Sequence, residues 1–303
     1  MDPLVFALVA GAAVLHVTWN VILKTAGDPL LAAAVGLATA AGVLCPIALV
    51  AWLAIGRPAI PTETLVLSVV SGALEAIYFA FLAAAYRRGD LSLVYPLARG
   101  SAPLLAVGIG VTVLDERLGA VGFLGVAALI GGILALQQPW RYLRVSGREH
   151  GGAAGFALLT GITIAAYSAV DRVAVRETEP WIYAALIYAT GAGFLWAYVW
   201  VYRRRRRIGI NTVAGDSTSE RAPFSARRAG IGGMITLVAY LLILTAFTIA
   251  PLTVVAPLRE SAIVLASGWG ALRLREADDR ADAVRRIGAA GLVVLGALLL
   301  AFD

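Results

Sequence analysis

The stretch VYPLARGSAPLL, Val94–Leu105, places one charged side chain, Arg99, within a run of mostly apolar residues. A second stretch, VAPLRESAIVL at Val255–Leu265, places Arg259 in nearly the same setting. Of the 303 residues, 60% are hydrophobic and 15% are charged, whereas a soluble domain has ~45–50% apolar and ~25% charged residues. Because the apolar residues form long runs, the sequence predicts a membrane protein with both arginines inside the bilayer.

Ten apolar segments are long enough to cross a bilayer core, which needs ~20 residues in a helix. Their continuous apolar character excludes the alternating pattern of a membrane β-barrel. The start, MDPLVFALVAG, lacks the basic region of a signal peptide and is expected to be a transmembrane helix. The expected fold is therefore an all-α integral membrane protein with ten transmembrane helices. The segments span residues 3–24, 30–55, 64–86, 91–113, 119–137, 152–174, 180–202, 229–249, 252–272 and 284–302.

The second half of the chain repeats features of the first half in the same order. FALVAG at 6–11 resembles FALLTG at 156–161, and PLARGS at 96–101 resembles PLRES at 257–261. Because five helices is an odd number, the second half would enter the membrane in the opposite direction. Two inverted repeats are a common plan of secondary transporters, whose substrate site lies between the halves. The predicted division is a first repeat at 1–138, a connecting loop at 139–151 and a second repeat at 152–303, with a flexible basic loop at about 203–228.

The distribution of basic residues predicts the orientation. Of 25 arginines and lysines, 19 lie in the connections that follow odd-numbered segments and 4 in those that follow even-numbered segments, while Arg99 and Arg259 lie within segments. The positive-inside rule then puts the odd connections in the cytoplasm and both termini outside. The net charge of +6 is explained in the same way, so nucleic-acid binding is not expected. The expected location is the cell membrane, the inner membrane in a bacterium.

Charged side chains within membrane helices are costly and mark candidate functional sites when they have partners. Arg99, Arg259, Glu75 and Glu260 all fall within apolar segments. One interpretation is an internal ion-pair network that fixes helix packing. The other is a polar cavity that binds a solute. In that case Arg99 is the first candidate to bind an anionic group of the solute and Arg259 the second, and Glu75 either balances Arg99 or carries a coupling proton. Glu260 is the weaker candidate, because adjacent residues on a helix point about 100° apart.

The first segment carries a polar face. His16, Asn20 and Lys24 are spaced by four residues and share one side of a helix, with Trp19 at its border. Polar groups in a membrane need partners, so this face is expected to point into the helix bundle. His16 and Asn20 either line a cavity or form interhelical hydrogen bonds, and Lys24 is expected to reach the membrane surface.

Aromatic residues recur one turn from the charged ones. Tyr78 shares a face with Glu75, Tyr95 with Arg99, and Tyr167 with Asp171. Asp171 lies near the end of its segment beside Arg172, so a local surface ion pair is expected there, and Tyr240 is a weaker cavity candidate. Tyrosine and tryptophan can stack on a solute or surround a cation, although they also pack ordinary helix bundles. The candidate substrate-binding residues are Arg99, Glu75, Tyr78, Tyr95, His16, Trp19, Asn20, Arg259 and Tyr167.

Enzyme motifs are absent from the sequence. It contains no H-E-x-x-H, G-x-S-x-G, Walker A or G-x-G-x-x-G pattern, and its only histidines are His16 and His150. The single cysteine, Cys45, excludes an internal disulfide and suggests no cysteine-based metal site. Neither catalytic residues, nor a metal site, nor a cofactor is expected.

At the level of motifs, the chain resembles the drug/metabolite transporter superfamily, in particular bacterial ten-helix transporters of the EamA type. The residues that carry the resemblance are HVTWNVILKTAGD at 16–28, YRRGDLSLVYPLARGSAPLLAV at 86–107, DERLG at 115–119 and the weaker second copy at 250–276. The resemblance covers nearly the whole chain. It implies two EamA repeats that export or exchange small metabolites, such as amino acids, or amphiphilic toxicants. The segments at 91–113 and 252–272 would then lie near the central cavity.

Two features depart from the family pattern. The second acidic turn, READDRADAVRR at 275–286, is longer and more charged than usual, and within it Glu276 aligns with Glu116. Family members are usually described with cytoplasmic termini, whereas the charge distribution of this chain places both termini outside.

The expected function is that of a secondary transporter that exports or exchanges an amino-acid-like or amphiphilic metabolite by alternating access. Its partners would be a small solute, the lipid bilayer and, as a candidate coupling ion, a proton. A functional monomer is the expectation, with a dimer as the alternative. A lipid-intermediate flippase of the same fold and a non-transporting membrane sensor or scaffold are the competing functions.

Overall fold

The computed structural model describes residues 2–25, 28–88, 91–138, 151–209, 224–269 and 280–302. The regular structure of this part of the chain is entirely helical, as predicted, and each predicted segment corresponds to one helix. The helices are α1 (Pro3–Thr25), α2 (Pro29–Ala54), α3 (Thr62–Arg88), α4 (Leu91–Thr112), α5 (Ala120–Gln137), α7 (Gly151–Ala174), α8 (Pro180–Gly209), α9 (Ala226–Ile249), α10 (Leu252–Trp269) and α11 (Arg280–Phe302).

Local sequence signals explain several helix ends. Asp28 precedes α2, and its carboxylate accepts a hydrogen bond of 3.1 Å from the Leu31 amide. Ser225 caps α9 in the same way. The helix α8 runs on to Gly209 and α9 begins at Ala226, so the connection is shorter than the predicted loop at 203–228. The helix continues beyond the apolar segment because arginine is a good helix former.

Six helices contain spans that are long and apolar enough to cross a membrane. They are Pro29–Ala54, Thr62–Ala85, Gly152–Ala174, Pro180–Arg204, Ala226–Ile249 and Ala283–Leu300. Shorter apolar stretches occur in α1, α4 and α5. By length and composition, the described chain is a helical bundle of the kind found in multi-pass membrane proteins.

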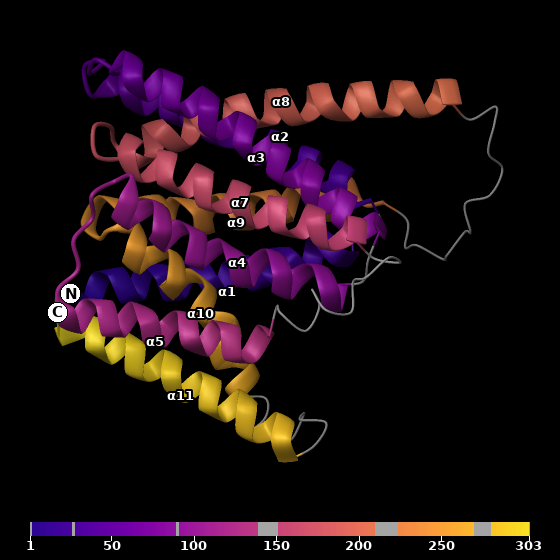
Figure 1. Ribbon diagram of the computed structural model, residues 1–303. Helices are drawn as coiled ribbons and strands as arrows, with labels where there is room; N and C mark the ends of the chain where they lie inside the picture. Colours follow the sequence, from indigo (N-terminus) through magenta and orange to yellow (C-terminus); the bar gives the residue numbers. More distant parts are fainter. Residues whose placement is uncertain are drawn as a thin grey trace.

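Helices from the two halves of the chain alternate in the bundle. The first-half helix α3 packs on α7 and α8, α1 packs on α9, and α2 packs on both α8 and α9. The helix α4 packs on α7 and α10. Both chain termini lie at the same end of the bundle (Figure 1).

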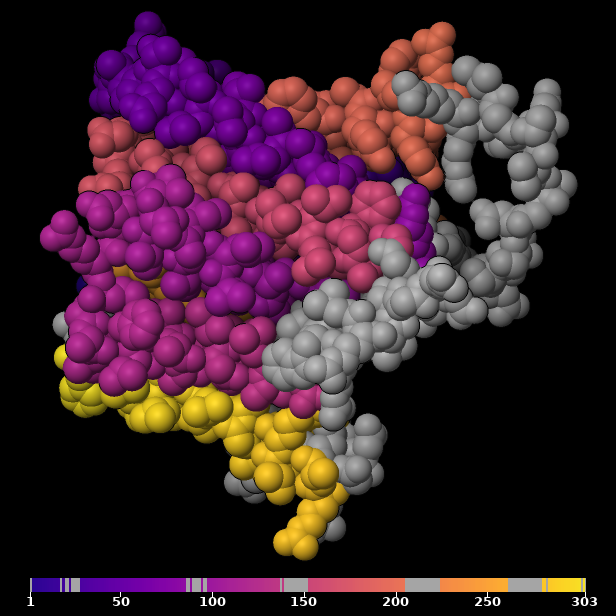
Figure 2. Space-filling view, in the orientation of Figure 1, coloured from indigo at the N-terminus to yellow at the C-terminus, as the bar shows by residue number. Residues whose placement is uncertain are grey.

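The helices α5 and α11 pack along one another at one edge of the molecule (Figure 2). Glycines permit this close approach: a Cβ built on Gly296 would lie 2.6 Å from the carbonyl oxygen of Gly125. Gly288 and Gly291 of the same helix have no described atom within 4 Å of a built Cβ, so they take no part in this close contact.

Candidate functional site

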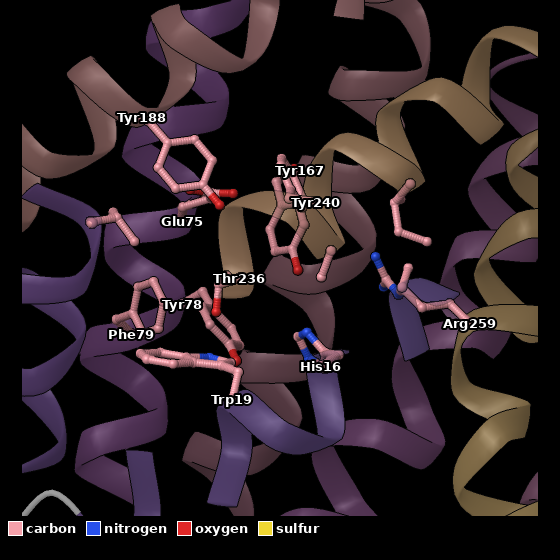
Figure 3. A pocket seen from close by; sticks show the side chains of 14 residues that line it. His16, Trp19, Glu75, Tyr78, Phe79, Tyr167, Tyr188, Thr236, Tyr240 and Arg259 are labelled. Carbon is pink, nitrogen blue, oxygen red and sulfur yellow. The ribbon is translucent and has the colours of Figure 1, made fainter. Parts of the chain in front are cut away.

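A cavity of about 50 Å³ lies where seven helices of the two halves meet. A volume of this size holds a few water molecules, since each needs roughly 10–15 Å³. Its wall carries six Tyr, Phe or Trp side chains, with charged side chains at separate places (Figure 3). The lining residues are Ala12, His16, Trp19, Leu37, Glu75, Tyr78, Phe79, Tyr167, Tyr188, Thr236, Ala239, Tyr240, Ile243 and Arg259.

The basic end of the cavity is built around Arg259 of α10. Its Nε donates to Glu260 Oε1 at 3.2 Å, and the same oxygen accepts a hydrogen bond of 2.9 Å from Nη1 of Arg99 on α4. Another terminal nitrogen of Arg99 contacts Nε2 of His16, which itself lines the cavity. Two guanidinium groups thus share one carboxylate oxygen, and Arg259 is the one that borders the cavity.

This arrangement corrects the predicted partner of Arg99. One of the two roles predicted for Glu75 was to balance Arg99, but the carboxylate that pairs with Arg99 is Glu260. The physical reason is helix packing: α10 lies along α4, whereas α3 has little contact with α4. Glu260, the weaker candidate from sequence, is 1% exposed and links the two arginines.

The acidic end of the cavity is formed by Glu75 of α3. Glu75 is 8% exposed and reaches the backbone of α8, where a Cβ built on Gly191 would lie 3.5 Å from its Oε2. Its carboxylate interacts with the hydroxyl of Tyr240 and lies near a second carboxylate, that of Asp171. Among the described residues, neither carboxylate takes part in an ion pair.

Asp171 is fully buried, and the predicted surface pair with Arg172 is wrong. Its Oδ1 accepts hydrogen bonds from Ser71 at 2.6 Å and Tyr183 at 2.9 Å, and its Oδ2 accepts one from Tyr240. Residues 171 and 172 point about 100° apart on the helix, so one faces the bundle interior while the other points elsewhere. Both carboxylate oxygens of Asp171 are therefore satisfied by hydroxyl donors.

Five aromatic rings form an arc along the cavity wall. Tyr78 contacts Phe79 edge-on with ring centroids 4.7 Å apart, and Tyr167 at 6.1 Å. Tyr240 continues the arc, with its ring centroid 6.4 Å from that of Tyr167 and 6.2 Å from that of Tyr188. These edge-to-face contacts join α3, α7, α9 and α8. Of these rings, Tyr167 and Tyr240 lie between Glu75 and Arg259 in Figure 3.

Two further features shape the wall. The ring of Trp19 packs against α9, because Gly232 leaves room for it: a Cβ there would lie 2.5 Å from Trp19 Cζ3. One turn further along α9, the hydroxyl of Thr236 is buried and has no hydrogen-bond partner among the described residues. A buried polar group without a partner is costly, so this hydroxyl marks a place where a ligand atom or water would bind.

Most of the candidate residues from sequence meet at this cavity. Glu75, Tyr78, His16, Trp19, Arg259 and Tyr167 line it. Arg99 is 5% exposed and contacts two residues next to this site, Glu260 and the lining residue His16. The side chains of Tyr95 and Asn20 lie outside the described residues, as does that of Lys24.

Other lining or supporting residues were not among the candidates. Tyr188 and Thr236 carry no distinctive signal in sequence. Tyr240 was ranked low, and Asp171 was assigned to the surface. One signal in the sequence could have placed Asp171 correctly: it lies one helical turn from Tyr167, so the two side chains share the face that points into the bundle.

A second polar cluster closes one end of the bundle. Glu116, in the connection after α4, accepts hydrogen bonds from the amides of Leu252 at 2.8 Å and Thr253 at 2.9 Å, and so caps the start of α10. Arg172 of α7 lies 3.5 Å from the same carboxylate and also donates to the carbonyl of Phe247 on α9. The cluster therefore ties the first half of the chain to three helices of the second. The aligned residue, Glu276, lies outside the described residues.

The similarity of this chain to known proteins concerns its fold and not its function. No protein-family model matches the sequence. No curated protein matches it either. Among solved structures, 28 chains match. One of them, described only as "Crystal structure of protein", superposes with a TM-score of 0.64 at 19% sequence identity, covering 97% of this chain and 98% of its own. At this identity the likeness shows a shared overall fold.

Proposed function

We propose that the protein is a secondary transporter that exports or exchanges a small metabolite through the central cavity. The observation that carries the proposal is the composition of the cavity wall. It contains an acidic residue from the first half of the chain, Glu75, and a basic one from the second half, Arg259. A site between two structural halves is where a transporter of inverted repeats binds its solute, and rocking of the halves exposes that site to each side in turn.

The packing of the helices supports two related halves. Each helix has a counterpart five helices further along or back in the chain. If every helix is replaced by its counterpart, the contact of α3 with α7 becomes the contact of α9 with α1, which the structure also contains. The contact of α3 with α8 likewise becomes that of α9 with α2. Three further contacts join a helix to its own counterpart and are therefore unchanged by the replacement: α2 with α8, α4 with α10, and α5 with α11. This pattern is expected of ten spans arranged as two inverted five-helix repeats.

The motifs of the sequence extend the proposal to a family. An EamA-type transporter of the drug/metabolite transporter superfamily accounts for the repeated arginine motif, the DERLG turn and the two five-helix halves. The proposed location is the cell membrane with both termini outside, because basic residues concentrate in the odd connections. Each chain contains a complete cavity, so a monomer is the proposed functional unit.

Solute uptake by proteoliposomes tests the proposal. The purified chain is reconstituted and supplied with labelled amino acids, sugar phosphates, nucleosides or cationic dyes. We expect protein-dependent uptake of at least one solute, and we expect the Glu75→Gln and Arg259→Gln variants to lose it. Matched substitutions at exposed positions, Glu63→Gln and Arg117→Gln, should leave uptake intact. Absence of uptake for every solute, or equal uptake by all four variants, contradicts a transport function centred on this cavity.

A further inference from the structure

We propose that the end of α8, together with the adjoining start of α9, binds the phosphate groups of acidic phospholipids at one face of the membrane. None of the residues that form this surface lines the central cavity. Lipid binding there does not require the chain to be a transporter. Three features of the molecule point to this partner: the length of α8, the side chains at its end and the charges of the neighbouring helix ends.

The helix α8 is longer than a bilayer core. Its 30 residues extend ~45 Å at 1.5 Å per residue, against a hydrocarbon thickness of ~30 Å. Trp181 and Trp200 bracket ~28 Å of this helix by the same rise, and tryptophan concentrates at both membrane interfaces. The five consecutive arginines at 203–207 begin ~5 Å beyond Trp200, at the level of the lipid headgroups. The last turns of α8 project beyond the rest of the bundle (Figure 1).

The side chains at this end of α8 pass from aromatic to basic along one face. Trp196, Trp200 and Arg204 are spaced by four residues, and the two tryptophans are 40% and 61% exposed. The guanidinium carbon of Arg204 lies 5.3 Å from the centre of the Trp200 ring. A guanidinium group that contacts a ring through its face can still donate from its edge to two oxygens of a phosphate.

The helix ends around this surface carry an excess of positive charge. Arg203 Nη2 lies 3.7 Å from a carboxylate oxygen of Asp28, which caps α2, and both side chains are about half exposed. The helix α2 packs on both α8 and α9. The first turn of α9 adds Arg227 and Arg228, both exposed. Together with Arg204, the described charged side chains at these three helix ends are four arginines and one carboxylate.

A phospholipid fits this surface better than a soluble anion does. The opposite ends of the same helices are flanked by Arg57, Glu177 and Glu179, so only one face of the molecule offers an excess of arginine here. A soluble phosphate would contact the arginines alone, whereas the acyl chains of a lipid would also cover the exposed rings of Trp196 and Trp200. Each arginine near an anionic membrane surface strengthens the attraction about fivefold.

The test measures the melting temperature of the full-length protein in a non-ionic detergent. The added probes are 1-palmitoyl-2-oleoyl phosphatidylglycerol, the phosphatidylcholine with the same chains, and glycerol 1-phosphate. We expect phosphatidylglycerol to stabilise the protein at a mole fraction about tenfold lower than phosphatidylcholine, and added salt to reduce this difference. Equal effects of the two lipids would overturn the inference. Equal effects of phosphatidylglycerol and glycerol 1-phosphate would also overturn it, since the surface would then bind a free phosphate group.

Two variants locate the lipid on the surface. One combines Arg204→Gln, Arg205→Gln and Arg206→Gln, and the other combines Arg227→Gln and Arg228→Gln. Glutamine has nearly the helix propensity of arginine, so both helices should persist. We expect the triple variant to need about tenfold more phosphatidylglycerol for the same stabilisation, and the double variant to change in the same direction. If the triple variant does not fold, the double variant decides.

The matched control removes three charges from the opposite end of the bundle. It combines Arg57→Gln, Arg117→Gln and Arg176→Gln, all of which are exposed, and it should respond to phosphatidylglycerol as the wild type does. An equal loss of the response in this control would show that only the net charge matters and would overturn the inference. An unchanged response in the variants of α8 and α9 would overturn it as well.

Discussion

Arg99 and Arg259, which occupy matching positions in the two halves of the chain, converge on one oxygen atom. Oε1 of Glu260 lies 2.9 Å from Nη1 of Arg99 and 3.2 Å from Nε of Arg259. All three side chains are largely buried, with side-chain exposures of 7%, 8% and 2% for Arg99, Arg259 and Glu260. A buried charge is retained only when it is paired, so Glu260 is the residue that makes the repeated arginine tolerable in the bundle.

Loss of the Glu260 charge should therefore destabilise the protein strongly. Glu260→Gln removes the carboxylate between two buried guanidinium groups, and breaking a buried ion pair from one side costs about 3–5 kcal/mol. The melting temperature in detergent should fall well below that of the wild type, while Glu63→Gln, an exposed change of the same kind, should have little effect. Equal melting temperatures for the two variants would show that Glu260 does not hold the arginines.

Asp171 should support the site without touching the solute. Asp171→Asn replaces one carboxylate oxygen with an NH₂ group, which is a donor and faces a hydroxyl group that also donates. This mismatch should lower the free energy of unfolding by about 1–3 kcal/mol. Because Tyr240 loses a fixed partner, solute affinity should also weaken. Double-mutant cycles with Tyr183→Phe and Ser71→Ala measure the coupling. Purely additive effects on the melting temperature would contradict direct hydrogen bonds to Asp171.

Two glycines of α11 should respond in opposite directions to the same change. Gly296→Ala places a Cβ 2.6 Å from the Gly125 carbonyl oxygen, so α5 and α11 must separate and the protein should melt at a lower temperature. Gly291→Ala meets no described atom within 4 Å and should be neutral or stabilise the helix by about 0.5–1 kcal/mol. Destabilisation by both variants to the same extent would argue against the close α5–α11 contact.

The Glu116 cluster should control access at the end of the bundle that carries the termini. Glu116→Gln weakens the cap of α10 and the contact with Arg172, so this end should open more often. The readout is labelling of Thr236→Cys by a membrane-impermeant maleimide in a Cys45→Ala background, in which the chain has no other cysteine. Labelling from the terminal side should accelerate relative to Asp115→Asn, a neighbouring exposed control. Unchanged labelling would mean that the cluster stabilises α10 but does not gate the cavity.

The helices of this protein were predictable from sequence, because long apolar runs define them with little ambiguity. Their pairing was not, since nothing in the sequence of α1 indicates that it packs on α9. This limit explains the errors at the site. Charge within apolar runs identified Arg259 and Glu75 as cavity candidates, and the polar spacing of the first segment identified His16. The position of α10 was needed to recognise Glu260 as the partner of Arg99. Asp171 was misassigned because its neighbour Arg172 offered a local partner, whereas three hydroxyl groups from other helices hold it inside.

The central claim is that the cavity opens alternately to the two sides of the membrane. The most direct test labels Thr236→Cys, in the Cys45→Ala background, with the impermeant maleimide in intact cells and in inverted membrane vesicles. Arg117→Cys and Arg228→Cys, at opposite ends of the bundle, verify that the reagent reaches each side. The account predicts labelling of Thr236→Cys in both preparations and protection by the transported solute in both. Labelling from one side alone, with both end controls reactive, would contradict alternating access and favour a static membrane scaffold.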